Sequence, residues 1–390
     1  MGLGIVCLIV AILASLSATE IVRVAAMRLS AVDRPGGRRL HCRPTPRLGG
    51  LGIFWGFCLA LVVATYAHPD WRAPGGDVHL ELLGLLAGGG VMVVAGLVDD
   101  IRGLRWTTKL AWQVVAAVML HAAGWKVESL GLPGFGIVAV GSWSLALTVG
   151  WVVFVTNAVN LIDGLDGLAC GVALIGSIAT SFLLGGSPEP ERFVALALTG
   201  ALLGFLWFNL NPALIFMGDA GSLFVGFVLS AVTLRAGQHA SPETFPLVPT
   251  LLVAVPFADT TYAIVRRALG AARGTRSIIQ FLQQARRRLF APDRGHIHHM
   301  LIQVGLSTRQ AVALLWGAAV SFALSGCVVA RHWMPGLLVT VVVAALWLQA
   351  YRRARRQRFE TYRRVRQQLR AARGIVEPAS AVEEGLERAA

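Results

Sequence analysis

Two adjacent carboxylates and a nearby lysine are the first residues along the chain whose types suggest chemistry. Asp99 and Asp100 end an apolar stretch in the string AGLVDDIRGLRWTTK, and Lys109 begins the next stretch. Neighbouring residues of a helix point about 100° apart, so one carboxylate can face a metal or substrate while the other orients a neighbour. Acidic side chains are unfavourable at a helix C-terminus, which argues against a merely solvated helix end. Lys109 returns across a short loop to a helix N-terminus, where anions bind well, so we expect it to bind phosphate.

A second polar cluster lies in the string TNAVNLIDGLDGLACG. It places Asn157, Asn160, Asp163 and Asp166 within ten residues. If this segment is helical, Asp163 and Asp166 share a face at a spacing of three residues, and Asn160 can join them. The glycines leave room for a ligand to approach the backbone. A DxxD pattern alone is a common helix cap, but so dense a polar cluster between two apolar runs predicts a binding site.

A third string, NLNPALIFMGDAGSLFVG, contains the single carboxylate Asp219. Gly218 and Gly221 flank it, and Ser222 follows. Small residues around one acid at a helix start suit a Mg²⁺ ligand beside phosphate oxygens. The chain lacks the GxxxxGK[ST] string of a P-loop, which disfavours an ATP hydrolase.

A fourth string, RGHIHH, gathers three of the nine histidines behind an arginine. Its candidate residues are Arg294, His296, His298 and His299. Zinc binding is the obvious alternative, but the chain has no CxxC pair and no HExxH string to accompany these histidines. Imidazoles and an arginine on one loop can instead bind a pyrophosphate.

These strings belong to a chain with the composition of a membrane protein. Hydrophobic residues make up 55% of the 390 residues and charged residues 14%, whereas an ordinary globular chain carries about 25% charged residues. A soluble protein this apolar could not cover its surface with polar groups. The composition therefore predicts an all-α polytopic membrane protein.

The apolar runs predict about 11 transmembrane helices. Each needs roughly 20 mostly apolar residues to cross a hydrocarbon core about 30 Å thick. The candidate helices start near Gly2, Gly49, Leu80, Leu110, Trp143, Leu168, Phe193, Ser222, Pro246, Gln310 and Pro335.

The basic residues predict the orientation of these helices. Alternate linkers and the C-terminal tail hold 30 of the 35 lysines and arginines, namely 7 in residues 23–47, 3 in 99–109, 9 in 266–309 and 11 in 352–390. Positive charge stays on the cytoplasmic side, so the N-terminus is predicted outside and the C-terminus inside. This distribution also explains the net charge of +14 without nucleic acid as a partner.

The polar strings all fall on linkers of the predicted cytoplasmic side. We therefore expect a single transmembrane catalytic domain over residues 1–351, followed by a basic cytoplasmic tail, residues 352–390. One cytoplasmic active site would be assembled from the loops at residues 23–48, 99–109, 157–167, 209–222 and 266–309.

Taken in order, these strings resemble the polyprenyl-phosphate N-acetylhexosamine-1-phosphate transferase family. The resemblance runs from about His41 to Ser307 and rests on HCRPTPRLGG, DDIRGLRWTTK, NAVNLIDGLDG, FMGDAGS and RGHIHH. The RGHIHH form is similar to the bacterial undecaprenyl-phosphate GlcNAc-1-phosphate transferase branch. The related phospho-MurNAc-pentapeptide translocase usually has three successive histidines, a run that Ile297 breaks here.

The resemblance implies a role for each candidate residue. Catalytic roles fall to Asp99, Asp100 and Lys109, with one of the two aspartates as a base or an orienting group for the lipid phosphate. Asp219 and Asn160 would bind Mg²⁺, with Mn²⁺ as an alternative. Asn157, Asp163 and Asp166 would bind the nucleotide sugar. The loop of Arg294, His296, His298 and His299 would close on the pyrophosphate.

The implied reaction transfers a sugar-1-phosphate from a UDP-sugar to undecaprenyl or another polyprenyl phosphate, with release of UMP. GlcNAc-1-phosphate is the expected group, and the reaction would initiate cell-envelope polysaccharide synthesis at the bacterial inner membrane. The expected partners are the UDP-sugar, the polyprenyl phosphate and membrane lipids, and the resemblance is compatible with a homodimer. Two alternatives stay open: the same reaction with another UDP-N-acetyl sugar or with UDP-MurNAc-pentapeptide, and a transporter with intramembrane acids.

Overall fold

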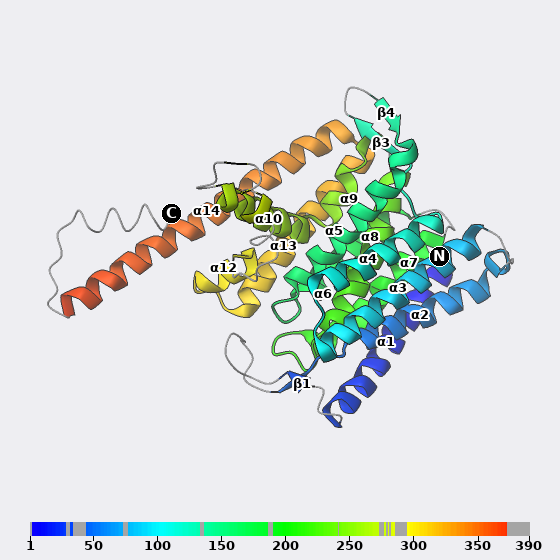
Figure 1. Ribbon diagram of the computed structural model, residues 1–390, viewed down its shortest axis with the longest axis horizontal. Coiled ribbons are helices and arrows are strands. Elements are labelled where there is room, and N and C mark those ends of the chain that lie inside the picture. Colours follow the sequence, from blue (N-terminus) through cyan, green and yellow to red (C-terminus); the bar gives the residue numbers. More distant parts are fainter. Residues whose placement is uncertain are drawn as a thin grey trace.

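The computed structural model describes residues 2–28, 32–33, 44–72, 77–132, 136–185, 190–240, 242–272, 277, 280, 282–284 and 295–372. Almost all of this part of the chain is helical (Figure 1). Its longer helices are α1 (Gly2–Arg28), α2 (Gly50–Ala67), α3 (Asp77–Arg102), α4 (Trp106–Ala122), α5 (Ser144–Ile162), α6 (Leu168–Leu183), α7 (Pro190–Asn209), α8 (Gly218–Ala240), α10 (Ala254–Ala272), α13 (Thr308–Arg331) and α14 (Trp333–Ala372). The short helices are α9 (Leu247–Leu252), α12 (Ile297–Gln303) and the 3₁₀ turns η1 (Pro69–Arg72), η2 (Gly141–Trp143) and η3 (Pro242–Thr244).

Eight helices in the described part of the chain are long and apolar enough to cross a membrane, which makes this an all-α polytopic membrane protein. They are α1, α2, α3, α5, α7, α8, α13 and the first part of α14. The other predicted starts also coincide with helices, namely α4, α6 and the pair α9 and α10. Of these, α6 is apolar but has 16 residues.

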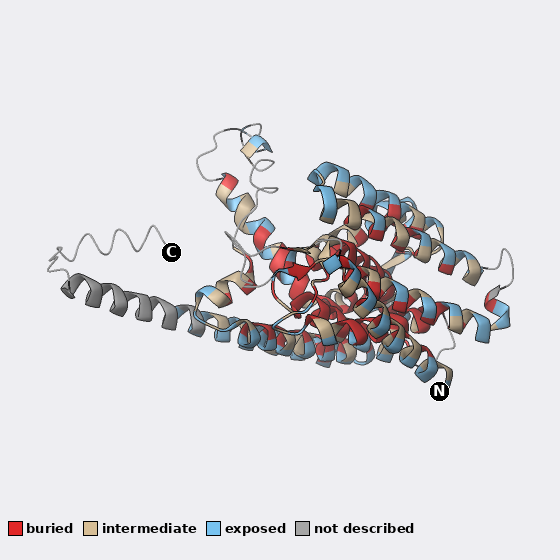
Figure 2. Ribbon diagram, turned by 90° about the horizontal axis from the view of Figure 1, so that it is seen from below, coloured by how far each residue is buried: buried red, intermediate tan, exposed pale blue. Residues whose placement is uncertain are grey.

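Helix α8 forms the centre of the bundle. In its most apolar window 94% of the residues are buried, and the helix packs against α2, α3, α5 and α6. The ring of Phe224 meets the rings of Phe54 and Phe57 edge-on, with centroids 5.2 and 5.3 Å apart. Figure 2 shows buried residues in the middle of the bundle and exposed residues along its outer surface. Many exposed side chains of the outer helices are large and apolar, among them Ile9, Trp55 and Val341, as a lipid-facing surface requires.

The N-terminus of α8 lies in close backbone contact with α2 and α3. A Cβ atom at Gly96 of α3 would lie 2.3 Å from Cα of Ala220, and one at Gly50 of α2 would lie 2.2 Å from the backbone nitrogen of Gly221. These distances exclude any side chain at Gly96 or Gly50. The start of α8, and with it Asp219, is therefore pressed against the ends of α2 and α3.

Two small antiparallel hairpins lie at opposite ends of the bundle (Figure 1). One pairs β1 (Val32–Asp33) with β2 (Thr45–Pro46), and the other pairs β3 (Ser129–Leu132) with β4 (Gly136–Ala139). Strand β2 is hydrogen-bonded to the segment before α8, because the Phe216 N–H donates to the carbonyl of Pro46 at 2.8 Å. The β1–β2 end of the bundle is therefore the end at which α8 begins.

The loops at this end are shorter than predicted. Residues 103–105 alone separate α3 from α4, α5 continues to Ile162, and α8 already begins at Gly218. Asp163 and Asp166 consequently lie in the turn between α5 and α6, so the condition under which they would share a helical face is not met. In this turn Asp163 is the C-cap residue of α5. Gly167, the residue before α6, adopts a left-handed φ of 77°, which turns the chain into α6.

Candidate active site

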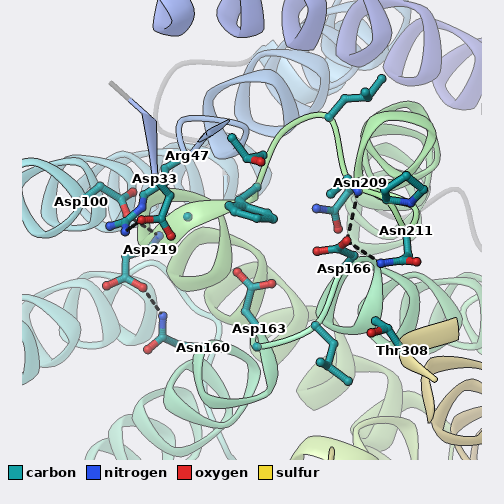
Figure 3. Close-up of a pocket in the computed structure, with 18 of the residues that line it drawn as sticks. Asp33, Arg47, Asp100, Asn160, Asp163, Asp166, Asn209, Asn211, Asp219 and Thr308 are labelled. Carbon is teal, nitrogen blue, oxygen red and sulfur yellow. Dashed lines mark hydrogen bonds and ion pairs between the residues drawn. The ribbon is translucent and has the colours of Figure 1, made fainter. Parts of the chain in front are cut away.

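A cavity of about 820 Å³ opens at the end of the bundle where α8 begins (Figure 3). Its walls come from the β1–β2 hairpin, the C-terminus of α3, the α5–α6 turn, the α7–α8 segment and the starts of α12 and α13. The structure thus brings segments from across the chain to one place. The predicted site residues that line the cavity are Asp99, Asp100, Asn160, Asp163, Asp166, Asp219 and His299.

Lys109 connects two of the predicted carboxylates. Its Nζ donates hydrogen bonds to Oδ2 of Asp99 and Oδ2 of Asp219, both at 2.7 Å, and lies 3.4 Å from Oδ1 of Asn160. Helices α3, α4, α5 and α8 therefore meet at one ammonium group. This group stands directly behind the cavity wall, where its charge offsets that of two acids.

Asp99 and Asp100 have different partners. Asp100 accepts hydrogen bonds from the backbone N–H groups of Asp219 (3.0 Å) and Ala220 (3.1 Å), at the N-terminus of α8. A carboxylate there is favoured by the positive end of the helix dipole. Asp99 faces Lys109 and accepts a hydrogen bond from the Leu104 N–H at 2.6 Å. Asp100 therefore orients the helix that carries Asp219, and Asp99 is the member of the pair beside the lysine.

The two asparagines of the second string are used differently. Asn160 donates from Nδ2 to Oδ1 of Asp219 and to Oγ of Ser222, both at 2.7 Å. Asn157, which was predicted to bind the nucleotide sugar, is not among the residues that line the cavity. Its Nδ2 donates to Oε1 of Gln113 at 2.6 Å and its Oδ1 accepts from Nε2 of Gln113 at 3.2 Å, which joins α5 to α4.

Asp163 and Asp166 occupy the middle and the far side of the cavity. Figure 3 shows Asp163 pointing into the space between the Asp219–Asn160 group and the Asp166–Asn211 group. Oδ2 of Asp166 accepts hydrogen bonds from Nδ2 of Asn211 (2.8 Å) and from the Ala213 N–H (3.1 Å). Burial deep in the cavity, reinforced by the neighbouring carboxylates, raises the pKa of Asp163 to about 8. A carboxyl group with this pKa is mostly protonated at neutral pH.

The histidine loop reaches the cavity through its last member. His299 lines the cavity, whereas His296 and His298 are buried behind it. The ring of His298 packs so closely on the α5–α6 turn that a Cβ at Gly164 would lie 2.6 Å from its Nε2. Burial lowers the pKa of His298 to about 4, so this imidazole is neutral. Arg294, predicted to belong to this loop, lies outside the described residues.

Several residues of the cavity, and one that contacts the histidine loop beside it, were missed by the sequence analysis. Arg47 forms an ion pair with Asp33 and lines the cavity together with Thr45. Asn209 and Asn211 begin the string NLNPALIFMGDAGSLFVG. In that string the sequence analysis considered Asp219 and its neighbours but not the two asparagines. Asp259, buried in α10, contacts the histidine loop. An acid within an apolar helix was the available signal for Asp259, because such residues are costly and usually functional.

Asp219 and the two polar side chains beside it include the oxygen types that bind a magnesium ion, although Asp219 now accepts from Lys109 and from Nδ2 of Asn160. The carboxylate of Asp219, the side-chain amide of Asn160 and Oγ of Ser222 lie together beside the cavity. Mg²⁺ is commonly bound by one or two carboxylates and completes its shell with water and substrate phosphates. The described residues contain no group of three or more His, Cys, Asp or Glu side chains of the kind that encloses a metal. One carboxylate with an amide and a hydroxyl beside it is the partial donor set that Mg²⁺ can share with substrate phosphates.

Comparison with known proteins gives a consistent result. Residues 82–237 match the family described as Glycosyl transferase family 4. A Bacillus subtilis protein named "Probable undecaprenyl-phosphate N-acetylglucosaminyl 1-phosphate transferase" is 34% identical over 344 residues, which cover 87% of this chain and 89% of the relative. A decaprenyl-phosphate N-acetylglucosaminephosphotransferase of Mycolicibacterium smegmatis is 36% identical over 78% of this chain and 77% of its own. An undecaprenyl-phosphate alpha-N-acetylglucosaminyl 1-phosphate transferase of Escherichia coli is 27% identical over 90% of this chain and 92% of its own.

Proposed function

Because this chain belongs to the family of polyprenyl-phosphate N-acetylglucosaminyl-1-phosphate transferases, we propose that it transfers GlcNAc-1-phosphate from UDP-GlcNAc to polyprenyl phosphate. The observation that carries the proposal is the junction at Lys109. One ammonium group joins Asp99 and Asp219 at the wall of a cavity that is large enough for a nucleotide sugar. The cavity lies at a helix end, where a lipid phosphate can reach it from the membrane surface.

The charge of the cavity supports magnesium dependence. Its described lining contains one arginine, Arg47, and six aspartates. Five of them, Asp33, Asp99, Asp100, Asp166 and Asp219, remain as acids against this single arginine when the mostly protonated Asp163 is left aside. Both substrates are anionic, so their phosphates would be repelled unless further positive charge entered with them. We propose that Asp219 and Asn160 hold Mg²⁺, or Mn²⁺ in its place. When bound, the ion would neutralise the diphosphate and stabilise the charge that develops during transfer.

The residues of this chain then position the reactants. An oxygen of the polyprenyl phosphate attacks the β-phosphorus, the bond to the α-phosphate oxygen breaks, and UMP leaves. Lys109 would donate a hydrogen bond to a phosphate oxygen, and Asp99 would hold that lysine in place. Asp163, Asp166 and the asparagines around them would form the nucleotide-sugar side, with His299 facing the pyrophosphate. In such a transfer positioning and charge stabilisation supply most of the catalysis.

We propose that the protein lies in the bacterial inner membrane with the cavity on the cytoplasmic side. Eleven spans, an outside N-terminus and an inside C-terminus agree with the 30 of 35 basic residues on one side. The cavity is built where α3 ends and α4 begins, the same end as the basic linker at residues 99–109. Catalytic groups gathered at one end of the bundle, rather than near the middle of broken helices, argue against a transporter.

The orientation predicts the labelling of two single-cysteine variants. After replacement of the five native cysteines, Asp70→Cys in η1 should react with a membrane-impermeant maleimide on intact cells. Arg105→Cys, in the exposed turn between α3 and α4, should react only after permeabilisation. Equal labelling of both positions from outside would show that the orientation is wrong.

The transfer itself is tested with purified protein and undecaprenyl phosphate. A panel of UDP-sugars, including UDP-GlcNAc, a UDP-6-deoxy-N-acetylhexosamine and UDP-MurNAc-pentapeptide, is offered in turn. We expect UMP release with UDP-GlcNAc and a polyprenyl-pyrophosphoryl-GlcNAc product by mass spectrometry. A lipid product from another sugar alone would replace the proposed donor. Uptake of UDP-sugar into sealed vesicles without UMP release would favour the transporter.

A further inference from the structure

A buried carboxylate holds the start of the helix that carries the histidine loop. Asp259 of α10 is 1% exposed. Its Oδ2 lies 2.7 Å from Nδ1 of His296, and its Oδ1 accepts a hydrogen bond from the Ile297 N–H at 2.6 Å. Because a carboxylate oxygen only accepts, Nδ1 of His296 is the donor in this hydrogen bond. One side chain thus fixes both the orientation of His296 and the first backbone N–H of α12.

The rest of α12 depends on this attachment. The helix has seven residues, too few to be stable without tertiary contacts. His296 is its N-cap residue, so His298 and His299 follow within the first turn. The ring of His298 rests against Gly164 in the α5–α6 turn, and His299 lines the cavity. A displacement at Ile297 would therefore move His299 relative to the cavity.

The helix that carries Asp259 is itself fixed to the catalytic part of the bundle. Phe257 of α10 packs against Phe154 of α5, with ring centroids 4.8 Å apart. Helix α5 also carries Asn160, which is bonded to Asp219. The contacts of Asp259 and Phe257 consequently connect the histidine loop to Asp219 through two helices. A buried acid is costly unless it is hydrogen-bonded, and here both of its oxygens are used on the loop.

We propose that Asp259 is a positioning residue for the sugar-phosphate transfer. Its carboxylate holds His296 and the N-terminus of α12, and through them keeps His299 at the cavity. This inference rests on the proposed function, because the position of His299 matters only if the cavity binds the pyrophosphate. Asp259 itself does not line the cavity and needs no contact with substrate.

The test is a double-mutant cycle between Asp259 and His296. Asp259→Asn keeps an acceptor for the Ile297 N–H but cannot offer a carboxylate to His296. We expect its kcat for UMP release to fall at least about 10-fold, because small displacements of positioned groups have large effects on rate. In a His296→Ala background the same substitution should cost less than about twofold, since the residue through which Asp259 acts is already gone. The matched control is Thr260→Val, which replaces a neighbouring buried side chain on the same helix whose hydroxyl has no hydrogen-bond partner in the described structure.

A second measurement reports the position of α12 and does not depend on enzymatic turnover. A trifluoromethyl label on Gln303→Cys, in a chain without its native cysteines, reports the environment at the end of α12. We expect Asp259→Asn to shift or split the label resonance while the melting temperature of the protein stays close to that of the parent. Thr260→Val should leave the resonance in place.

The outcomes separate the two proposals. Without UMP release by the unsubstituted protein the proposed function fails, whereas the label still reports whether Asp259 holds α12. The positioning role is overturned by normal turnover in Asp259→Asn, by equal losses in both backgrounds, or by an unmoved resonance. Asp259→Glu, which keeps the charge, is run in the same cycle in case the Asn variant does not fold. If neither variant folds, Asp259 serves stability alone and the proposal is wrong.

Discussion

Replacing Asp219 by Asn is expected to lower the rate of UMP release at least about 100-fold, or about 2.7 kcal/mol of transition-state stabilisation. The substitution keeps the shape of the side chain and removes the negative charge proposed to bind Mg²⁺. It leaves the start of α8 in place, because Asp100 is bonded to the backbone N–H groups of residues 219 and 220 and not to the Asp219 side chain. The loss should therefore be chemical, and the variant should require more Mg²⁺ for half-maximal rate.

The measurement is UMP release against Mg²⁺ concentration for the parent protein, Asp219→Asn and Asp219→Ala. Glu243→Gln in η3 is the control, since it removes one exposed carboxylate that does not line the cavity and lies in a turn that contacts the β3–β4 hairpin, at the other end of the bundle. It should leave both the rate and the Mg²⁺ requirement unchanged. A near-normal rate and an unaltered Mg²⁺ requirement in Asp219→Asn would exclude the metal assignment and make Asp163 or Asp166 the next candidate.

Lys109→Gln is expected to lower the rate by about 100- to 1,000-fold, the range seen when a positioned donor to a developing charge is lost. Its effect on Mg²⁺ should have the opposite sign to that of Asp219→Asn. In the parent protein the ammonium group of Lys109 lies 2.7 Å from a carboxylate oxygen of Asp99 and from one of Asp219, so its single charge offsets part of theirs. Without it the cavity wall is more negative, so less Mg²⁺ should be needed for half-maximal rate although the maximal rate is low.

Arg105→Gln provides the matched control for Lys109→Gln. It removes a positive charge one turn before Lys109, at the N-cap of α4, but Arg105 is exposed and does not line the cavity. Its rate should stay within about threefold of the parent, because a solvated charge contributes little. If Lys109→Gln raised the Mg²⁺ requirement as Asp219→Asn does, Lys109 would belong to the fold of the site rather than to its charge balance.

The helices could be predicted from the sequence because each apolar run is a local property. A helix lies at every start predicted from such a run, from Gly2 to Pro335. The polar strings could also be recognised, since polar groups that interrupt apolar runs must leave the hydrocarbon or find partners. The sequence analysis left the local conformation of one string open, and the structure decided it: Asp163 and Asp166 lie in a turn and do not share a helical face.

The sequence by itself determined which residues are polar among apolar ones, and therefore seven of the residues that line the cavity, from Asp99 to His299. The tertiary structure decided what each of them contacts. It assigned Asp100 to the N-terminus of α8 and Asp99 to Lys109, and it joined Asn160 to Asp219 while Asn157 was paired with Gln113. It also brought Asp259 to His296 across 37 residues. The physical reason is that hydrogen bonds depend on distances of about 3 Å and on direction, and these are set by how helices pack, as where Gly50 and Gly96 let α8 approach α2 and α3.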